Sequence, residues 1–324
     1  MEYSYLGRSG LKVSKLCLGT MNFGPFADEQ ESHAIMDKAL EIGINFFDTA
    51  NVYGWKMGEG LTEKILGNWL AKDEVRRKQI VLATKVYGEM GKDPNESGLS
   101  KYHIIRACEE SLQRLQTDRI DLYQMHHVER STPYEEIWEA MEQLVKDGKV
   151  LYIGSSNFAG WDLAKAQSVA SKRNFMGIIS EQHKYSLSCR LPELEVLPSA
   201  KDHGIGIIPW SPLDGGLLGG HAFDANKKSR TADDFSVSKI KLLKKNIEDY
   251  YAFCKELGES PADVAIAWLL HNDAVTSPII GPRNMEQLTG IIKSIEIKLT
   301  EESLNKLDEI WPGPGGSAPA AYSW

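Results

Sequence analysis

The chain has 324 residues, of which 42% are hydrophobic and 25% are charged, a composition typical of an ordinary globular protein. Its 37 Lys and Arg residues against 45 Asp and Glu residues give a net charge of −8, and no basic stripe interrupts the sequence. This balance argues against binding to nucleic acid or to an anionic membrane, so we expect neither partner.

The cysteines and the N-terminal residues indicate the cellular compartment in which we expect the protein. The four cysteines are scattered without a C-x-x-C pair, which predicts reduced thiols rather than a disulfide framework. The opening MEYSYLGRSG is too polar for a signal peptide, and no apolar stretch approaches the ~20 residues of a membrane span. We therefore expect a cytoplasmic protein without a membrane partner, and both a monomer and a homo-oligomer stay open.

Strand and helix patterns alternate along most of the chain. A small hairpin is predicted first, because Arg8-Ser9-Gly10 separates two short alternating runs. Apolar runs then predict strands at 15–19, 44–48, 80–85, 120–126, 150–155, 177–182, 205–210 and 276–280. Helices are predicted between them, at 28–42, 59–71, 100–115, 133–147, 160–173, 193–203, 261–271 and 285–293. These bounds are supported by helix-start signals at Ser100, Thr132-Pro133 and Ser260-Pro261, and by helix-end glycines at Gly43, Gly148 and Gly204.

This alternation favours parallel strands joined by right-handed crossovers. A closed barrel of eight strands accommodates the pattern without leaving a sheet edge. The competing fold, a doubly wound open sheet, usually carries G-x-G-x-x-G after its first strand, whereas this chain has Leu18-Gly19-Thr20-Met21 there. We therefore predict an α/β fold, a (β/α)8 TIM barrel with an N-terminal β-hairpin, extra helices and long loops at its carboxyl face, forming one domain over 1–324.

Three segments depart from the simple alternation. Residues 213–238 form a long stretch with little periodicity, which in a compact domain usually serves as a functional lid. Residues 239–257 predict an additional amphipathic helix. The tail at 312–324 is rich in Pro, Gly and Ala, but it ends in Tyr322 and Trp324.

Side chains suited to proton transfer follow three consecutive predicted strands. Asp48 and Tyr53 follow the second strand, Lys85 ends the third, and His126 ends the fourth. Because the carboxyl ends of parallel strands meet at one edge of a barrel, where barrel enzymes carry their active sites, we expect these groups to converge. Taken singly, each has an ordinary structural explanation as a strand-end aromatic, a solvated lysine or a rim histidine. Their joint placement is what predicts a site.

The neighbouring pair His126-His127 raises the alternative of a metal site. Adjacent residues of a strand point to opposite faces, so the two imidazoles are not expected to share one ion. No further spacing of His, Cys and carboxylate residues supports a metal ion, and we predict none.

Seven short motifs occur in order along the chain. They are D-T-A-x-x-Y-G at 48–54, A-T-K at 83–85, D-L-Y-x-x-H at 121–126, S-N-F at 156–158, E-Q at 181–182, W-S-P-L at 210–213 and I-G-P-R at 280–283. As a set they resemble the aldo-keto reductases, including bacterial members similar to reductases of nucleotide-linked deoxy sugars. The resemblance covers the whole chain and implies NADPH-dependent reduction of an aldehyde, ketone or keto sugar to the alcohol.

The side chains suit this reaction. Reduction of a carbonyl by hydride needs a proton donor aimed at the developing alkoxide, and Tyr53 is the expected acid. An ordinary phenol has a pKa near ~10, so a nearby cation is needed to ease proton loss. Lys85 is expected to supply that charge, Asp48 to hold Lys85 in place, and His126 to orient the carbonyl oxygen. The resemblance implies the same four roles.

A nicotinamide cofactor is expected at the same face of the barrel. Ser156, Asn157 and Gln182 offer donors and acceptors for its carboxamide, and Trp210 offers a ring to stack on the nicotinamide. The glycine-rich run at 215–220 lets the backbone approach a pyrophosphate. The remaining predicted cofactor contacts are Gly19, Thr20, Met21, Ser211, Pro212, Leu213, Gly215, Gly216, Gly281, Arg283 and Gln287.

The choice between NADPH and NADH is expected to depend on Arg283. Its guanidinium fork, at the start of a predicted helix, suits the 2′-phosphate that only NADP(H) carries. The family often has an Asn where this chain has Ile291, and this departure leaves NADH as the alternative cofactor.

The substrate pocket and two rival functions complete the predictions. Candidate pocket residues are Met21, Trp55, Tyr87, His127, Tyr322 and Trp324, whose aromatic character suits aldehydes, ketones and sugar rings alike. A barrel aldolase would instead use Lys85 as a Schiff base. A nucleotide-sensing regulatory subunit, resembling ion-channel β subunits of the same fold, would bind the cofactor and turn it over slowly.

Overall fold

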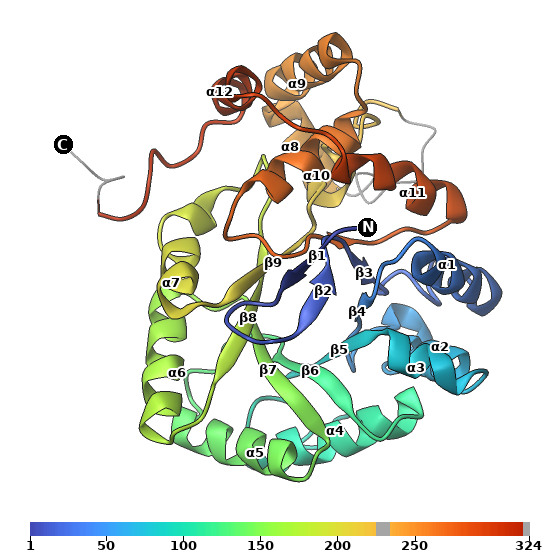
Figure 1. Cartoon of the computed structure of the whole chain (residues 1–324), viewed down its shortest axis with the longest axis vertical. Helices are drawn as coiled ribbons and strands as arrows, with labels where there is room; N and C mark the ends of the chain where they lie inside the picture. Colours follow the sequence, from blue (N-terminus) through green and yellow to red (C-terminus); the bar gives the residue numbers. More distant parts are fainter. Residues whose placement is uncertain (225–233, 320–324) are drawn as a thin grey trace.

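The structure of the chain is a computed structural model, which describes residues 1–224 and 234–319. A ring of strands occupies the centre of Figure 1, and helices surround it. The barrel strands are β3 (Cys17–Gly19), β4 (Phe46–Asp48), β5 (Val81–Val86), β6 (Ile120–Met125), β7 (Val150–Ser156), β8 (Ile178–Lys184), β9 (Gly206–Trp210) and β10 (Ile279–Ile280). Neighbouring strands pair in parallel in this order, and β10 pairs with β3.

The barrel closes between β9 and the segment that precedes β10. Ile207 N donates to Ala274 O at 3.1 Å, and Thr276 N donates to Ile207 O at 2.8 Å. This short parallel ladder joins the two edges of the sheet. The closed ring of parallel strands alternating with helices confirms the predicted (β/α)8 barrel.

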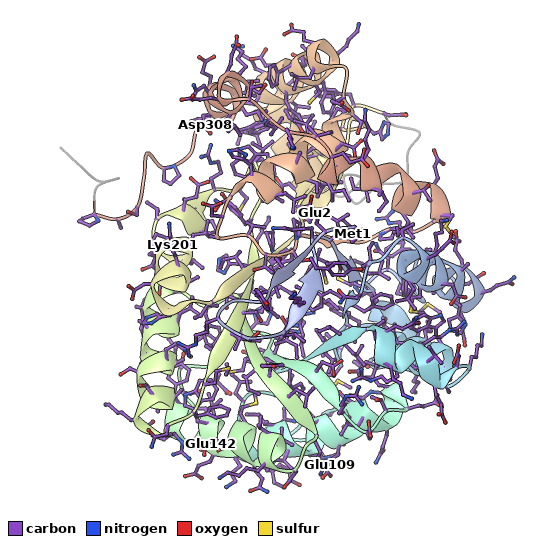
Figure 2. The ribbon with its side chains drawn as sticks, viewed as in Figure 1. Met1, Glu2, Glu109, Glu142, Lys201 and Asp308 are labelled. Carbon is purple, nitrogen blue, oxygen red and sulfur yellow. The ribbon has the colours of Figure 1, made fainter. Side chains whose placement is uncertain are left out.

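Helices α1 to α7 form an arc around the right, lower and left sides of the strands, and α8 to α12 lie together at the top of the view (Figure 1). Figure 2 shows side chains filling the space between strands and helices, with Glu109 of α4 and Lys201 of α7 at the periphery. The helices are α1 (Glu29–Glu41), α2 (Leu61–Leu70), α3 (Glu74–Gln79), α4 (Lys101–Leu115), α5 (Tyr134–Lys146), α6 (Gly160–Lys172), α7 (Val196–His203), α8 (Asp234–Leu242), α9 (Lys244–Leu257), α10 (Pro261–His271), α11 (Met285–Gly290) and α12 (Glu301–Ile310). Within residues 1–224 and 234–319, the 3-10 turns are η1 (Trp55–Met57), η2 (Leu191–Glu193), η3 (Asp214–Gly216) and η5 (Ile291–Ile295).

The predicted N-terminal hairpin is present, and it seals the amino-terminal end of the barrel. Strands β1 (Tyr3–Tyr5) and β2 (Lys12–Ser14) pair antiparallel, and Leu6 and Val13 are fully buried against the first residues of the barrel strands. Gly7 adopts a φ of +54°, and a Cβ atom there would lie 2.3 Å from Ile179 O. Only glycine permits this approach. The opposite, carboxyl-terminal end is therefore left to carry the site.

Most predicted helix ends are confirmed by their capping contacts. The Ser100 side chain accepts from His103 N, and the Ser260 side chain accepts from Asp263 N with Pro261 at the first helical position. The prediction at Thr132-Pro133 is wrong in register, because Pro133 is itself the N-cap and α5 begins one residue later. The end glycines Gly43, Gly148 and Gly204 all have positive φ, as predicted.

The segments outside the alternation differ from their predictions in detail. The extra helix predicted at 239–257 is two helices, α8 and α9, which meet at Leu243, and α8 begins inside the predicted lid. Helices α3 and α12 were not predicted. Residues 225–233 of the lid-like stretch and the tail residues Tyr322 and Trp324 lie outside the described residues. Across the described ranges, every helix is too short or too polar to cross a bilayer.

Candidate active site

The strand register brings the predicted catalytic residues to one end of the barrel. Asp48 is the last residue of β4 and pairs in register with Gly19 of β3 and Ala83 of β5. Lys85 lies next to the end of β5 and pairs with Gln124 of β6, and His126 directly follows β6. Tyr53 lies in the loop after β4. All four predicted residues therefore come together at the carboxyl edge.

Lys85 is fixed by three acceptors. Its Nζ donates to Asp48 Oδ2 at 2.5 Å, to Thr49 O at 2.8 Å and to Tyr53 Oη at 3.2 Å. An ammonium group has three N–H donors, so these contacts use all of them. The side chain is 0% exposed, and burial alone would lower its pKa, but the charge of Asp48 and then of Tyr53 outweighs burial and raises the pKa. Lys85 is thus a buried cation whose ammonium group lies against the phenol oxygen.

Asp48 is held by a second set of contacts that orients its other oxygen. Oδ1 accepts from Gln124 Nε2 at 2.9 Å and from Gln182 Nε2 at 2.8 Å. Gln182 was predicted to contact the carboxamide of the cofactor. In the structure its side-chain amide bonds Asp48, and it also donates to Gln124 Oε1 at 3.2 Å. Gln124 was missed from the sequence, although it pairs in register with Lys85 of the neighbouring strand β5.

Tyr53 meets the lysine through its oxygen and its ring. The Lys85 Nζ lies 4.9 Å from the ring centroid, and the His126 ring contacts the Tyr53 ring edge to face, with centroids 5.9 Å apart. Because Tyr53 Oη accepts a hydrogen bond from Lys85, its own O–H hydrogen must point in another direction. The phenol is therefore a donor positioned beside a fixed positive charge.

The placement of His127 corrects a prediction. The rings of His126 and His127 stack face to face, with centroids 5.1 Å apart and planes 11° apart, and Tyr87 contacts His127 edge to face at 5.3 Å. The expectation that the two rings point to opposite faces is wrong because β6 ends at Met125, so strand alternation no longer applies. Tyr53, His126, His127 and Tyr87 thus form a continuous row of rings.

His126 is expected to stay neutral at physiological pH. Burial, followed by the charges of Lys85 and His127, lowers its pKa to about 2. The ordinary value is ~6.5, so between these values the unfolded chain binds the proton and the folded chain does not. The contribution of His126 to the free energy of unfolding is therefore complete above pH ~6.5, and it is lost as the pH falls toward about 2. An NMR titration should show a flat His126 Hε1 shift from roughly pH 8 to pH 5.

The variant His126→Gln assigns this resonance and supplies the matched control. Its free energy of unfolding should fall less than that of the wild type between roughly pH 7 and pH 5, because glutamine cannot bind the proton. A His126 shift with a midpoint near ~6.5 would contradict the desolvated placement.

Asn157 links the predicted carboxamide contacts to Trp210. It adopts a φ of +60°, its Nδ2 donates to His126 O at 3.1 Å and to Ser156 Oγ at 2.9 Å, and its Oδ1 accepts from Trp210 Nε1 at 3.0 Å. Ser156 is buried and donates to Gln182 O at 2.8 Å. Asn157 therefore connects the half-buried Trp210 ring to His126, which belongs to the row of rings formed by Tyr53, His126, His127 and Tyr87 (the histidine row).

The segment after β9 contains an ionic cluster that the sequence did not reveal. Asp214 accepts from Ser188 Oγ at 2.6 Å, forms an ion pair with Lys239 of α8, and lies 3.5 Å from Lys184 Nζ. Burial would raise the pKa of Asp214, but the hydrogen bonds from Lys239 and Ser188 lower it. The cluster anchors η3, where Gly215 has a φ of +70°.

The other predicted cofactor residues surround this segment. Gly215 N donates to Ser211 Oγ at 3.1 Å, and a Cβ atom at Gly215 would have nothing within 4 Å, so the backbone there faces open space. Thr20 is buried, and its Oγ1 donates to Asp48 O at 2.9 Å. Pro212 is buried, whereas Met21 and Leu213 are half-buried.

Arg283 lies between β10 and α11. Its backbone N donates to Gln287 Oε1 at 2.9 Å, and its guanidinium stacks on the Phe26 ring, with Cζ 4.6 Å from the centroid. Burial lowers the pKa of Arg283. Helix α11 has only six residues rather than the predicted nine, because the 3-10 turn η5 takes over at Ile291, whose side chain is buried in the core. Any anion preference here therefore depends on the guanidinium.

The structure shows the contacts of only some of the candidate pocket residues. Trp55 is half exposed and contacts Phe26, which the sequence did not predict, and Tyr87 and His127 belong to the histidine row. The pocket prediction for Tyr322 and Trp324 concerns residues outside the described ranges.

Comparison with known proteins places this chain in a family. The profile of the Aldo/keto reductase family matches residues 15–312. The uncharacterized oxidoreductase YrpG of Bacillus subtilis is 57% identical over the full length of both chains. The versiconal hemiacetal acetate reductase of Aspergillus parasiticus is 33% identical over 95% of this chain and 96% of its own. A probable voltage-gated potassium channel subunit beta of Oryza sativa is also 33% identical, over 96% of both chains.

Proposed function

Since the chain belongs to the aldo/keto reductase family, we propose that it reduces an aldehyde, ketone or keto sugar to the alcohol with NADPH, Tyr53 being the general acid. One observation carries this proposal. The Lys85 ammonium, fixed by Asp48 and Thr49, also donates to the Tyr53 oxygen at 3.2 Å, so a buried positive charge lies against the phenol that is expected to give up its proton. The oxidoreductase and reductase names of the relatives agree with this chemistry.

The residues around the site fit a nicotinamide dinucleotide. Trp210 offers a half-buried ring beside the histidine row, and Gly215 offers a backbone that faces open space. Arg283 offers a guanidinium suited to a 2′-phosphate. Bound at these residues, the reduced nicotinamide would supply the hydride.

The side chains then handle the proton. Tyr53 Oη donates its hydrogen to the carbonyl oxygen as negative charge develops there, and the carbonyl carbon gains the hydride, so the product is the alcohol. Lys85 stabilises the phenolate that remains, because its charge lies 3.2 Å from the oxygen. The neutral His126 donates from one ring nitrogen and orients the carbonyl. A solvent proton restores Tyr53.

The geometry argues against a Schiff-base aldolase. An amine nucleophile must lose its proton, which is favoured when its surroundings lower its pKa. Lys85 has a raised pKa, no exposed surface and three engaged donors. Borohydride trapping with a carbonyl substrate should therefore leave Lys85 unmodified.

Cofactor choice tests the role of Arg283. Arg283→Ala should weaken NADPH binding by about ten- to a hundredfold, because a charge-assisted hydrogen bond contributes roughly 1.5–3 kcal/mol. NADH lacks the 2′-phosphate, so its affinity should hardly change. Titration of the Trp210 fluorescence with both cofactors measures the two affinities. Equal losses for NADPH and NADH would make Arg283 a structural residue.

A further inference from the structure

Phe26, in the loop between β3 and α1, supports the guanidinium of Arg283. The ring is 43% exposed, and Arg283 Cζ stands 4.6 Å from its centroid. Trp55 contacts the same ring in a T-shaped arrangement, with centroids 5.6 Å apart and planes at 82°. Phe26 therefore lies between a predicted cofactor residue and a predicted pocket residue, although it belongs to neither set.

The loop that carries Phe26 also holds the backbone of the Arg283 segment. Asn22 Nδ2 donates to Gly281 O at 2.7 Å, and Asn22 O accepts from Phe26 N at 2.9 Å. The Thr62 hydroxyl donates to Phe23 O at 3.0 Å and fixes the loop to α2. The ring beneath the guanidinium and the backbone that precedes Arg283 thus share one rigid support.

We propose that Phe26 is a positioning residue that pre-organises Arg283 for the 2′-phosphate of NADPH and so contributes to selection against NADH. This inference rests on the proposed function. A phenyl ring holds a guanidinium through the attraction of its π face and has no oxygen that accepts a hydrogen bond, so the contact with Phe26 does not compete with a phosphate for the N–H donors of Arg283. An arginine side chain otherwise loses considerable rotamer freedom on binding, and a preformed stack reduces that loss.

The test compares NADPH and NADH affinities by calorimetry in four proteins: wild type, Phe26→Leu, Phe26→Tyr and Arg283→Ala. Leucine keeps the apolar contact but removes the aromatic face, whereas tyrosine keeps the face. Phe26→Leu should lower NADPH affinity by about two- to fivefold, equivalent to ~0.5–1 kcal/mol, and leave NADH affinity unchanged. Phe26→Tyr should bind both cofactors as the wild type does.

A double-mutant cycle shows whether the effect acts through the arginine. In the Arg283→Ala background, Phe26→Leu should no longer change NADPH affinity. Tyr102→Leu, which removes an exposed aromatic from α4, controls for the loss of a surface ring and should leave both affinities unchanged.

The outcomes separate this inference from the proposed function. Suppose that the wild type prefers NADPH and that Arg283→Ala removes this preference. If Phe26→Leu then keeps the preference, or lowers the affinities for NADPH and NADH equally, the positioning role of Phe26 is wrong and the proposed function stands. An undiminished effect of Phe26→Leu in the Arg283→Ala background also overturns the role. If the wild type binds neither nucleotide, both proposals fall.

Discussion

Replacing Tyr53 with phenylalanine should slow carbonyl reduction by about 10²–10⁴-fold, the range that general acid catalysis contributes. The substitution removes one oxygen, which accepts from Lys85 at 3.2 Å, and keeps the ring that contacts His126. The fold and the NADPH affinity should therefore be unchanged. Single-turnover measurements of NADPH oxidation with bound substrate isolate this step from substrate binding and product release.

A matched control for Tyr53→Phe is Tyr87→Phe, which removes a phenol oxygen from the other end of the same row of rings. It should keep turnover within about tenfold of the wild type, since its hydroxyl is not assigned the proton. A Tyr53→Phe variant that also stays within about tenfold would remove Tyr53 from the role of acid.

Replacing Lys85 with methionine should abolish most turnover and also destabilise the protein. The phenolate would lose its neighbouring charge, so the apparent pKa of the ionising group in the pH–rate profile should rise. Asp48 would be left as a buried carboxylate, 2% exposed, without its 2.5 Å ion-pair partner. Removing one partner of a buried pair typically costs about 3–5 kcal/mol of unfolding free energy, which denaturant titration measures.

The double variant Asp48→Asn/Lys85→Met separates the two effects. It removes both charges, so much of the unfolding free energy lost in Lys85→Met should return, whereas turnover should stay low. If the double variant recovers turnover together with stability, Lys85 serves the fold rather than the reaction. A pH–rate profile of Lys85→Met that overlays the wild-type profile would refute the Tyr53–Lys85 pairing.

The barrel was predictable because its strands are short apolar runs, separated by amphipathic segments with clear ends. Ser100 and Ser260 mark helix starts through side-chain hydrogen bonds that sequence alone suggests. The break between α8 and α9 at Leu243 was not predictable, because the amphipathic pattern runs through it without a Gly or Pro. Whether residues 213–238 act as a lid and whether 1–324 is a single domain stay predictions.

The site was predictable where it depends on strand ends and less so where it depends on loops. Asp48 and Lys85 follow directly from parallel register, because both lie at the carboxyl edge of neighbouring strands. His127 was misplaced because the alternation rule was extended past the end of β6. Phe26 was missed because its contact with Arg283 joins loops far apart in the sequence, and no local pattern signals such a contact.

The measurement that tests the central claim most directly is multiple-turnover oxidation of NADPH by the purified protein across a panel of aldehydes, ketones and keto sugars, with the alcohol product quantified. We expect several panel members to be reduced, with one alcohol formed for each NADPH oxidised. A nucleotide-sensing regulatory subunit, the rival function, would bind NADPH yet turn it over only very slowly. Tight NADPH binding without multiple turnover on any carbonyl would contradict the proposed reductase activity.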